Sequence, residues 1–170
     1  MRKGNGASLS QKFRNLLAMR KKKYSGVMKS AELLAQDQLQ FSLDNDSDCF
    51  DKKRAELYGI TDQEQFVRLA WALDVYDLLE PSYNFENFVG VSVYTTGWAS
   101  PLNEDGEVDC SPSEHPERRR VALVTTITSE GRGSALAFTD EEEIITDPGT
   151  ASGSLADAIA DCWLRSRLFA

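Results

Sequence analysis

The sequence predicts an α+β protein: N-terminal helices, then a mostly antiparallel four-stranded sheet, then a C-terminal helix packed on that sheet as a second layer. Three observations predict this class. Apolar residues recur at helical spacing in residues 8–79, apolar and polar residues alternate within 88–146, and a helical stripe returns over 155–163. The chain has 170 residues, of which 41% are hydrophobic and 27% charged, so its composition is typical of a globular protein.

The N-terminal part is predicted to be helical. Apolar spacing favours helices over residues 8–23, 27–39, 51–58 and 62–79. The last of these is apolar on nearly every side, so we expect it to be the central buried helix, and Pro81 ends it.

Two local signals support the boundaries of these helices. Gly59 follows residues 51–58 at the position where a left-handed glycine commonly ends a helix. Thr61 precedes Glu64 by three residues, which is the spacing of a capping box at a helix start.

The remaining chain alternates as strands do. Residues 88–98, 119–128, 134–139 and 143–146 are predicted strands, and the apolar character of both faces of 119–128 places it centrally. Residues 130–133 are expected to turn between two of them. The fourth strand is short and acidic, as protected sheet edges are.

The ends of this region are a loop and a helix. Residues 99–117 contain three prolines and many acids and are predicted to form a long loop. The C-terminal helix follows Ser154, which suits the N-cap position, while Trp71, Trp98 and Trp163 are assigned to the core or to a subunit contact.

Charge divides the chain into a basic helical arm, residues 1–30, and a single acidic α+β domain, residues 31–170. The arm holds nine bases and no acid, whereas the domain holds all 27 acids against ten bases, a net charge of −17 within a total of −8. An arm of this kind predicts contact with a polyanion such as nucleic acid or the ribosome; a targeting segment or a solvated helix face are the alternatives. The candidate contact residues are Lys12, Arg14, Arg20, Lys21, Lys22 and Lys23.

Cysteine usage and hydropathy indicate a cytoplasmic protein. Cys49, Cys110 and Cys162 are odd in number and widely spaced, which fits reduced thiols better than disulfides or a zinc site. Residues 44–48 alternate carboxylates like a calcium loop, but Cys49 and Ala55 stand where that loop needs glycine and glutamate. No run of about 18 apolar residues occurs, so no membrane span is expected. No metal or cofactor is predicted.

Catalytic motifs are weak. His115 is the single histidine, no Gly-x-Ser-x-Gly elbow occurs, and a pairing of His115 with Cys110 rests on sequence proximity alone. We therefore predict no catalytic residue.

Two segments are candidates for binding an anion or ligand. Arg118, Arg119 and Arg120, together with His115, form a cluster that suits phosphate; alternation places Arg119 opposite the other two, and the alternative role is to neutralise the acidic loop before it. The small-residue loop 147–154 precedes a helix, so its backbone N–H groups suit an anion, with a plain connection and N-cap as the alternative. Its candidate residues are Gly149, Ser152 and Ser154.

Several C-terminal motifs together resemble a known family. These are Thr96–Pro101, His115–Arg118, Gly131-Arg132-x-Ser134-Ala135-Leu136, Thr146–Gly149 and the helix from Leu155 to Trp163. They are similar to an uncharacterised family of actinobacterial cytoplasmic proteins, over roughly residues 61–168. The resemblance implies a bacterial cytoplasmic protein and carries no activity or site residue with it.

These observations lead to one main functional hypothesis and two alternatives. The main one is a non-catalytic cytosolic interaction or regulatory protein with a protein partner, in which the acidic surface mimics a polyanion; a homodimer is compatible with it. One alternative is a nucleic-acid or ribosome binder that uses residues 1–30. The other is a small ligand-binding module or enzyme that uses His115 and Arg118–Arg120.

Overall fold

The computed structural model describes residues 29–107, 110–141, 143–147 and 153–168. One six-stranded antiparallel sheet, in the order β2-β1-β3-β4-β5-β6, organises them. The strands are β1 (Ala55–Ile60), β2 (Phe66–Ala72), β3 (Gly90–Ala99), β4 (Arg119–Thr128), β5 (Gly131–Phe138) and β6 (Ile145–Asp147). The helices are α2 (Ala31–Asn45), α3 (Val75–Leu79) and α4 (Ser154–Leu168), with a short 3-10 turn, η1 (Pro112–Glu114).

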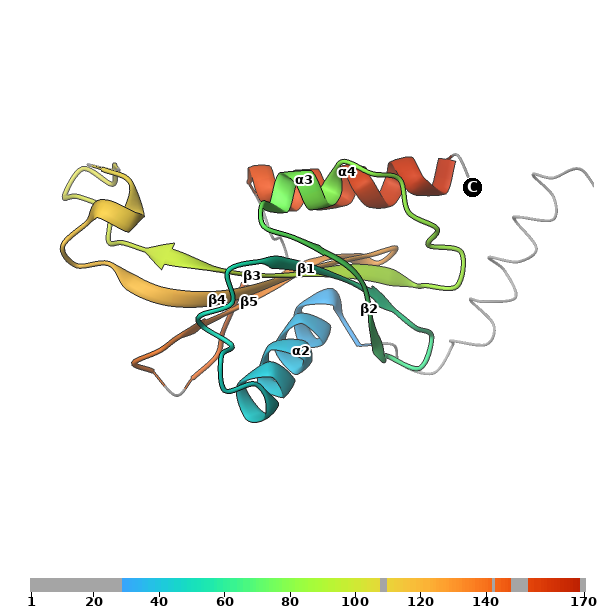
Figure 1. Ribbon diagram of the computed structural model, residues 1–170, viewed down its shortest axis with the longest axis horizontal. Coiled ribbons are helices and arrows are strands. Elements are labelled where there is room, and N and C mark those ends of the chain that lie inside the picture. The colour runs from blue at the N-terminus through green and yellow to red at the C-terminus, as the bar shows by residue number, and fades with distance from the viewer. Residues whose placement is uncertain (1–28, 108–109, 142, 148–152, 169–170) are drawn as a thin grey trace, which may run out of the picture.

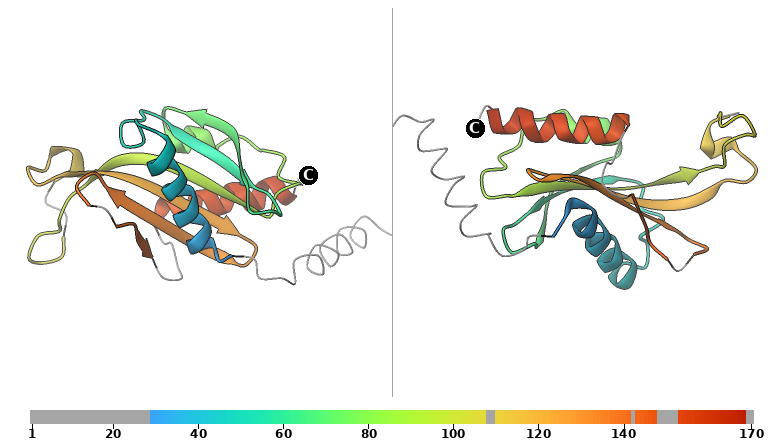
Figure 2. Two further views of the ribbon diagram at one scale, coloured as in Figure 1. Left: turned by 90° about the horizontal axis from the view of Figure 1, so that it is seen from below. Right: turned by 180° about the vertical axis from the view of Figure 1, so that it is seen from behind.

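The helices cover both faces of the sheet, which gives three layers rather than two. Figure 1 shows α2 on one face and α3 and α4 together on the other, and the views of Figure 2 agree. Each face has its own apolar core: Leu39 of α2 packs with Tyr94 and Val124 on one face, whereas Trp163 of α4 packs with Leu57 and Val93 on the other. The prediction of a four-stranded sheet in a two-layer structure was therefore wrong.

The two additional strands occupy segments predicted as helices. In the first of these segments, residues 51–54 form a loop and residues 55–58 are part of β1; in the second, 62–79, the chain forms β2 and the short α3. A segment that is apolar on both sides is compatible with a strand as well as with a buried helix. Here the segment forms a strand because β2 pairs with β1.

The signals read as helix ends belong instead to the β1–β2 hairpin. The Gln65 N–H donates to Thr61 Oγ1 at 3.1 Å, and Glu64 has a φ of 61°, so these residues form the turn. Gly59 lies within β1, where a Cβ atom would stand 2.5 Å from the Phe88 ring. The glycine permits this close approach of the ring rather than ending a helix.

Other predicted elements lie close to their expected positions. β4 has the predicted bounds, β3 lies within two residues of its prediction, and Ser30 caps the helix expected in 27–39, which runs on to Asn45. β5 begins three residues early because its turn lies at Ser129-Glu130. The helix predicted over 8–23 lies outside the described residues.

α2 lies directly against the sheet at Gly133. A Cβ atom at this position would stand 2.2 Å from the backbone nitrogen of Glu32. The start of the helix therefore packs backbone to backbone on β5, which brings the C-terminal end of α2 and the loop after it over β3 and β4.

Candidate functional site

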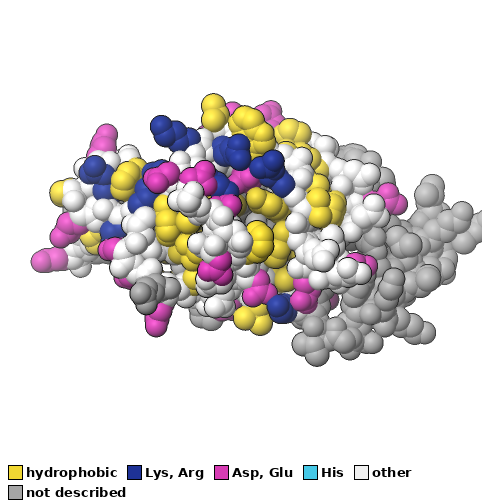
Figure 3. Space-filling view, turned by 60° about the horizontal axis from the view of Figure 1, so that its bottom comes forward, with side chains coloured by type: hydrophobic (Ala, Val, Ile, Leu, Met, Phe, Trp, Pro, Cys, Tyr) yellow, Lys and Arg dark blue, Asp and Glu magenta, His cyan; other side chains and the backbone are white. Residues whose placement is uncertain are grey.

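The basic side chains of residues 31–170 are unevenly distributed. Residues 31–170 contain ten bases, and six of them gather near the start of β1 and the end of β3. We call this the basic surface: Lys52, Lys53, Arg54, Arg68, Arg118 and Arg120, with the exposed rings of Trp71 and Trp98. Figure 3 shows Lys and Arg side chains gathered beside hydrophobic ones on this side of the molecule.

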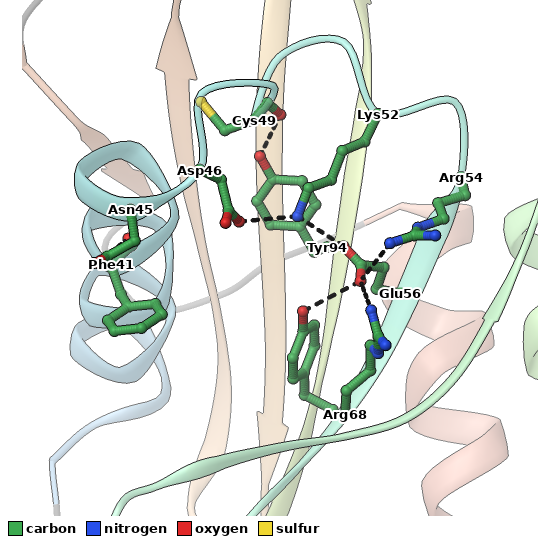
Figure 4. Close-up of polar contacts among 10 residues, drawn as sticks. Phe41, Asn45, Asp46, Cys49, Lys52, Arg54, Glu56, Arg68 and Tyr94 are labelled. Carbon is green, nitrogen blue, oxygen red and sulfur yellow. Dashed lines mark hydrogen bonds and ion pairs between the residues drawn. The ribbon is translucent and has the colours of Figure 1, made fainter.

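A buried carboxylate anchors one part of the basic surface. Glu56 of β1 is only 1% exposed, and its oxygens lie 3.0 Å from Lys52 Nζ, 3.2 Å from Arg68 Nη1 and 3.8 Å from Arg54 Nη2. Lys52 also contacts Asp46, in the turn that ends α2, at 2.9 Å. Figure 4 shows the three cations converging on Glu56 from the loop and from β2.

The hydrogen bonds of neighbouring residues tie the 46–54 loop to the sheet. The buried Tyr94 hydroxyl donates to the Cys49 carbonyl, Thr96 Oγ1 donates to the Lys52 carbonyl at 2.5 Å, and Arg120 Nε donates to the Phe50 carbonyl at 2.9 Å. This loop is therefore held in place, and the cations that follow it have a defined position beside β3.

Charge pairing shifts the pKa values within this cluster. Burial by itself raises the pKa of the Glu56 carboxyl, but the hydrogen bonds and charges of Lys52, Arg68 and Arg54 outweigh it and bring the pKa below its ordinary value. Burial likewise lowers the pKa of the Lys52 ammonium, whereas Asp46 and Glu56 more than compensate and raise it. Both groups are charged at neutral pH.

The Glu56 shift predicts a specific acid sensitivity. Its folded-state pKa lies below the ordinary value of 4.5, so the carboxylate stabilises the fold fully above that pH and loses its contribution as pH falls through the folded-state pKa. We expect the difference in unfolding free energy between wild type and Glu56→Gln, measured in urea, to stay constant from about pH 7 to 5 and to shrink below about 4.5. A difference unchanged at about pH 3 contradicts the assignment.

A groove lies next to the Glu56 cluster, and Arg54 belongs to both. This open cavity has a volume of about 540 Å³ and lies where β1 begins, β2 ends and β3 continues past both. Its lining residues are Lys52, Lys53, Arg54, Ala55, Leu73, Asp74, Val75, Thr95, Thr96, Gly97, Trp98 and Arg120.

Cations also surround the aromatic rings of the basic surface. The guanidinium carbons of Arg118 and Arg120 lie 5.1 and 4.8 Å from the centre of the Trp98 ring, and that of Arg54 lies 5.4 Å from the Trp71 ring. Lys53 is exposed and has no ion pair within the part of the chain that the structure describes. Four cations and one carboxylate, Asp74, line the groove, so it is suited to an anionic group that also offers apolar contact.

The predicted arginine cluster divides between two faces of the sheet. Arg118 and Arg120 lie with Trp98, whereas Arg119 lies over Phe138 and pairs with Asp140 and Glu141, each at 2.7 Å. These two acids follow β5, so the expected neutralisation of the acidic loop before the cluster was wrong for Arg119.

His115 has a local structural role. Its Nδ1 accepts from the Glu117 N–H at 3.0 Å, and its carbonyl accepts from Arg118 Nη1 at 3.3 Å. It caps η1 and supports the segment that leads to Arg118, and it does not line the groove.

The other predicted contact residues do not join the basic surface. Ser154 lies at the start of α4, 3.1 Å from the Tyr76 hydroxyl. Gly149, Ser152 and the six candidate residues of the arm lie outside the described residues. No group of His, Cys, Asp and Glu suited to a metal occurs among the residues described, and the three cysteines are free thiols. None of the helices described is long and apolar enough to cross a membrane.

Sequence reasoning missed most of the basic surface. Lys52-Lys53-Arg54 is a visible run of bases in an acidic region, but its assignment to a helix hid its position at the start of a strand. Trp71 and Trp98 are 54% and 40% exposed, so only Trp163 fulfils the prediction of a core tryptophan.

The fold and the site together define a class: a three-layer protein with one antiparallel sheet, helices on both faces and a basic, aromatic surface on a part of the chain that is acidic as a whole. Comparison with protein-family models, curated proteins and solved structures finds no match for this chain.

Proposed function

We propose that this protein is a non-catalytic interaction protein that binds an acidic segment of a partner protein on its basic surface. The observation that carries the proposal is a groove lined by four of the ten bases of residues 31–170, Lys52, Lys53, Arg54 and Arg120, and by the exposed Trp98. Arginine and exposed aromatic side chains are the residue types that contribute most to protein interfaces.

Charge favours a short acidic segment over a nucleic acid. The positive charge is confined to the small area of the groove, whereas residues 31–170 as a whole carry a net charge of −17. A nucleic acid carries phosphates along its full length, so its parts outside the groove face repulsion from the acidic surface within about 8–10 Å. A short peptide confines its carboxylates to the groove and places apolar side chains on Leu73 and Trp98.

Lys53→Glu tests this function directly. Lys53 holds no structural ion pair in the described part of the chain, so the variant should fold as the wild type does. We expect it to bind a fluorescein-labelled peptide of ten residues, Glu alternating with Val, about fivefold more weakly in low salt, equivalent to about 1 kcal/mol. The difference should decrease with salt in a fluorescence-polarisation titration.

Two charge reversals serve as matched controls. Arg132→Glu changes the same charge on β5, away from the groove, and Lys22→Glu changes it in the basic arm. Both should bind the peptide like the wild type. Equal binding by Lys53→Glu and wild type, or loss of binding in Lys22→Glu alone, refutes the groove as the site. Preference for an oligonucleotide over the peptide refutes the partner class.

A further inference from the structure

The strand β3 is longer than its neighbour β1. Pairing of β1 with β3 ends at Glu56 and Tyr94, whereas pairing of β3 with β4 continues to Ala99 and Arg119. Within the described chain, residues Thr95–Ala99 therefore have a strand partner on one side only, and Figure 1 shows β3 and β4 continuing together past the start of β1.

The groove runs along this unpaired edge. Four of its lining residues, Thr95–Trp98, belong to the edge, and Lys53, Arg54 and Leu73 line it as well. A Cβ atom added to Gly97 would meet no atom within 4 Å, so the face of the sheet above Gly97 is open.

The edge strand β6 and the segment of β3 that protrudes past β1 differ in how they are protected against pairing. β6 is three residues long and follows exposed acids, Glu141 and Glu143, which discourage pairing with another strand. Residues Thr95–Ala99 contain no charge and no proline, and their β-branched and aromatic side chains favour an extended neighbour. The side chains of this edge therefore offer none of the usual protection against strand addition, and the 46–54 loop contacts the edge at Thr96.

We infer that the acidic segment binds as an added β-strand, antiparallel or parallel to Thr95–Ala99, and continues the line of β1 into the groove. This inference rests on the proposed function and specifies how the partner is held. Main-chain hydrogen bonds to β3 supply affinity, and alternate side chains supply specificity. Five residues of β3 extend over about 17 Å.

The basic side chains beside the edge indicate which residues the bound segment should contain. Arg120 and Trp98 lie on the α2 side of β3, and Arg54, which contacts Glu56, lies on the same side. Leu73 and Val75, where the chain leaves β2 for α3, line the groove too. Because successive side chains of a strand point to opposite faces, a carboxylate at every second position, with apolar residues between, fits both sides.

Charge complementarity also decides against a second copy of this chain. Two copies paired at this edge would bring Lys53, Arg54 and Arg120 towards the same residues of the other copy. Like charges facing each other across an interface oppose association, whereas carboxylates neutralise them.

The test uses the full-length protein and the same Glu-Val peptide in two N-methylated forms, each methylated on one alternate set of amides. One form loses the amide N–H groups that face β3, so we expect it to bind at least about tenfold more weakly, because two or three hydrogen bonds are lost. The other form should bind like the parent peptide. Hydrogen exchange of amides in Thr95–Ala99 should slow on binding of the parent.

The outcomes separate this inference from the proposed function. If both methylated forms bind like the parent and Lys53→Glu still weakens binding, the groove binds acidic segments but not as a strand, and the inference is wrong. If the parent does not bind, the proposed function fails too. A dimer in sedimentation that becomes a monomer in Lys53→Glu assigns the edge to a second copy and also overturns the inference.

Discussion

Replacing Glu56 by alanine should destabilise the protein by about 3–5 kcal/mol, because it removes the carboxylate that three cations share. Lys52 is 10% exposed at its side chain and keeps Asp46 as a partner, but Arg54 and Arg68 lose the acid that lies 3.8 and 3.2 Å away. The remaining positive charges then repel one another, and the largely buried Lys52 is the one least screened by solvent. Equilibrium unfolding in urea at pH 7, followed by circular dichroism, measures the change.

An exposed ion pair provides the control for this substitution. Asp157→Ala removes the partner of Arg132, 2.8 Å away, but the Asp157 side chain is 70% exposed. We expect a loss below about 1 kcal/mol, as is usual for surface pairs. If the two substitutions cost the same, Glu56 is not the buried centre of the cluster.

Replacing Trp163 by alanine should cost a similar amount, about 3–5 kcal/mol, through loss of packing. Trp163 is 3% exposed on the sheet-facing side of α4, and its ring lies 5.4 Å from that of Phe85. Truncation leaves a cavity between α4, the segment after α3 and the sheet, which the surrounding chain fills only in part. Urea unfolding again gives the change in free energy.

The neighbouring residue of the same helix serves as a matched control. Leu164 is 59% exposed, and alanine favours a helix as well as leucine does. Leu164→Ala should therefore change the unfolding free energy by no more than about 0.5 kcal/mol. A small effect at Trp163 with a large one at Leu164 would mean that α4 presents the opposite face to the sheet.

Local pattern was sufficient for some elements and insufficient for others. β4 is ten residues long and rich in β-branched residues, which indicates a central strand, and α4 carries a regular apolar stripe that indicates its buried face. β2 is apolar on both sides and short, and its strand conformation depends on backbone hydrogen bonds to β1. No window of sequence contains that partner.

The candidate site shows the same division. The run Lys52-Lys53-Arg54 and the bases Arg118 and Arg120 are visible in the sequence, more than 60 positions apart. Nothing local places them on one groove. Their proximity follows from the antiparallel order in which β1 and β4 lie on either side of β3, with Trp98 opposite Arg120.

By itself, the sequence determined the charge division of the chain, the state of the long periodic strands and the two longer helices that the structure describes, because charge and periodicity are local properties. Only the tertiary structure decided that the sheet has six strands, that Glu56 is buried among cations, and that β3 extends past β1 beside a basic groove. Those features depend on strand pairing and register, which join residues far apart in the chain, and the free energy that selects them comes from contacts that exist only after folding.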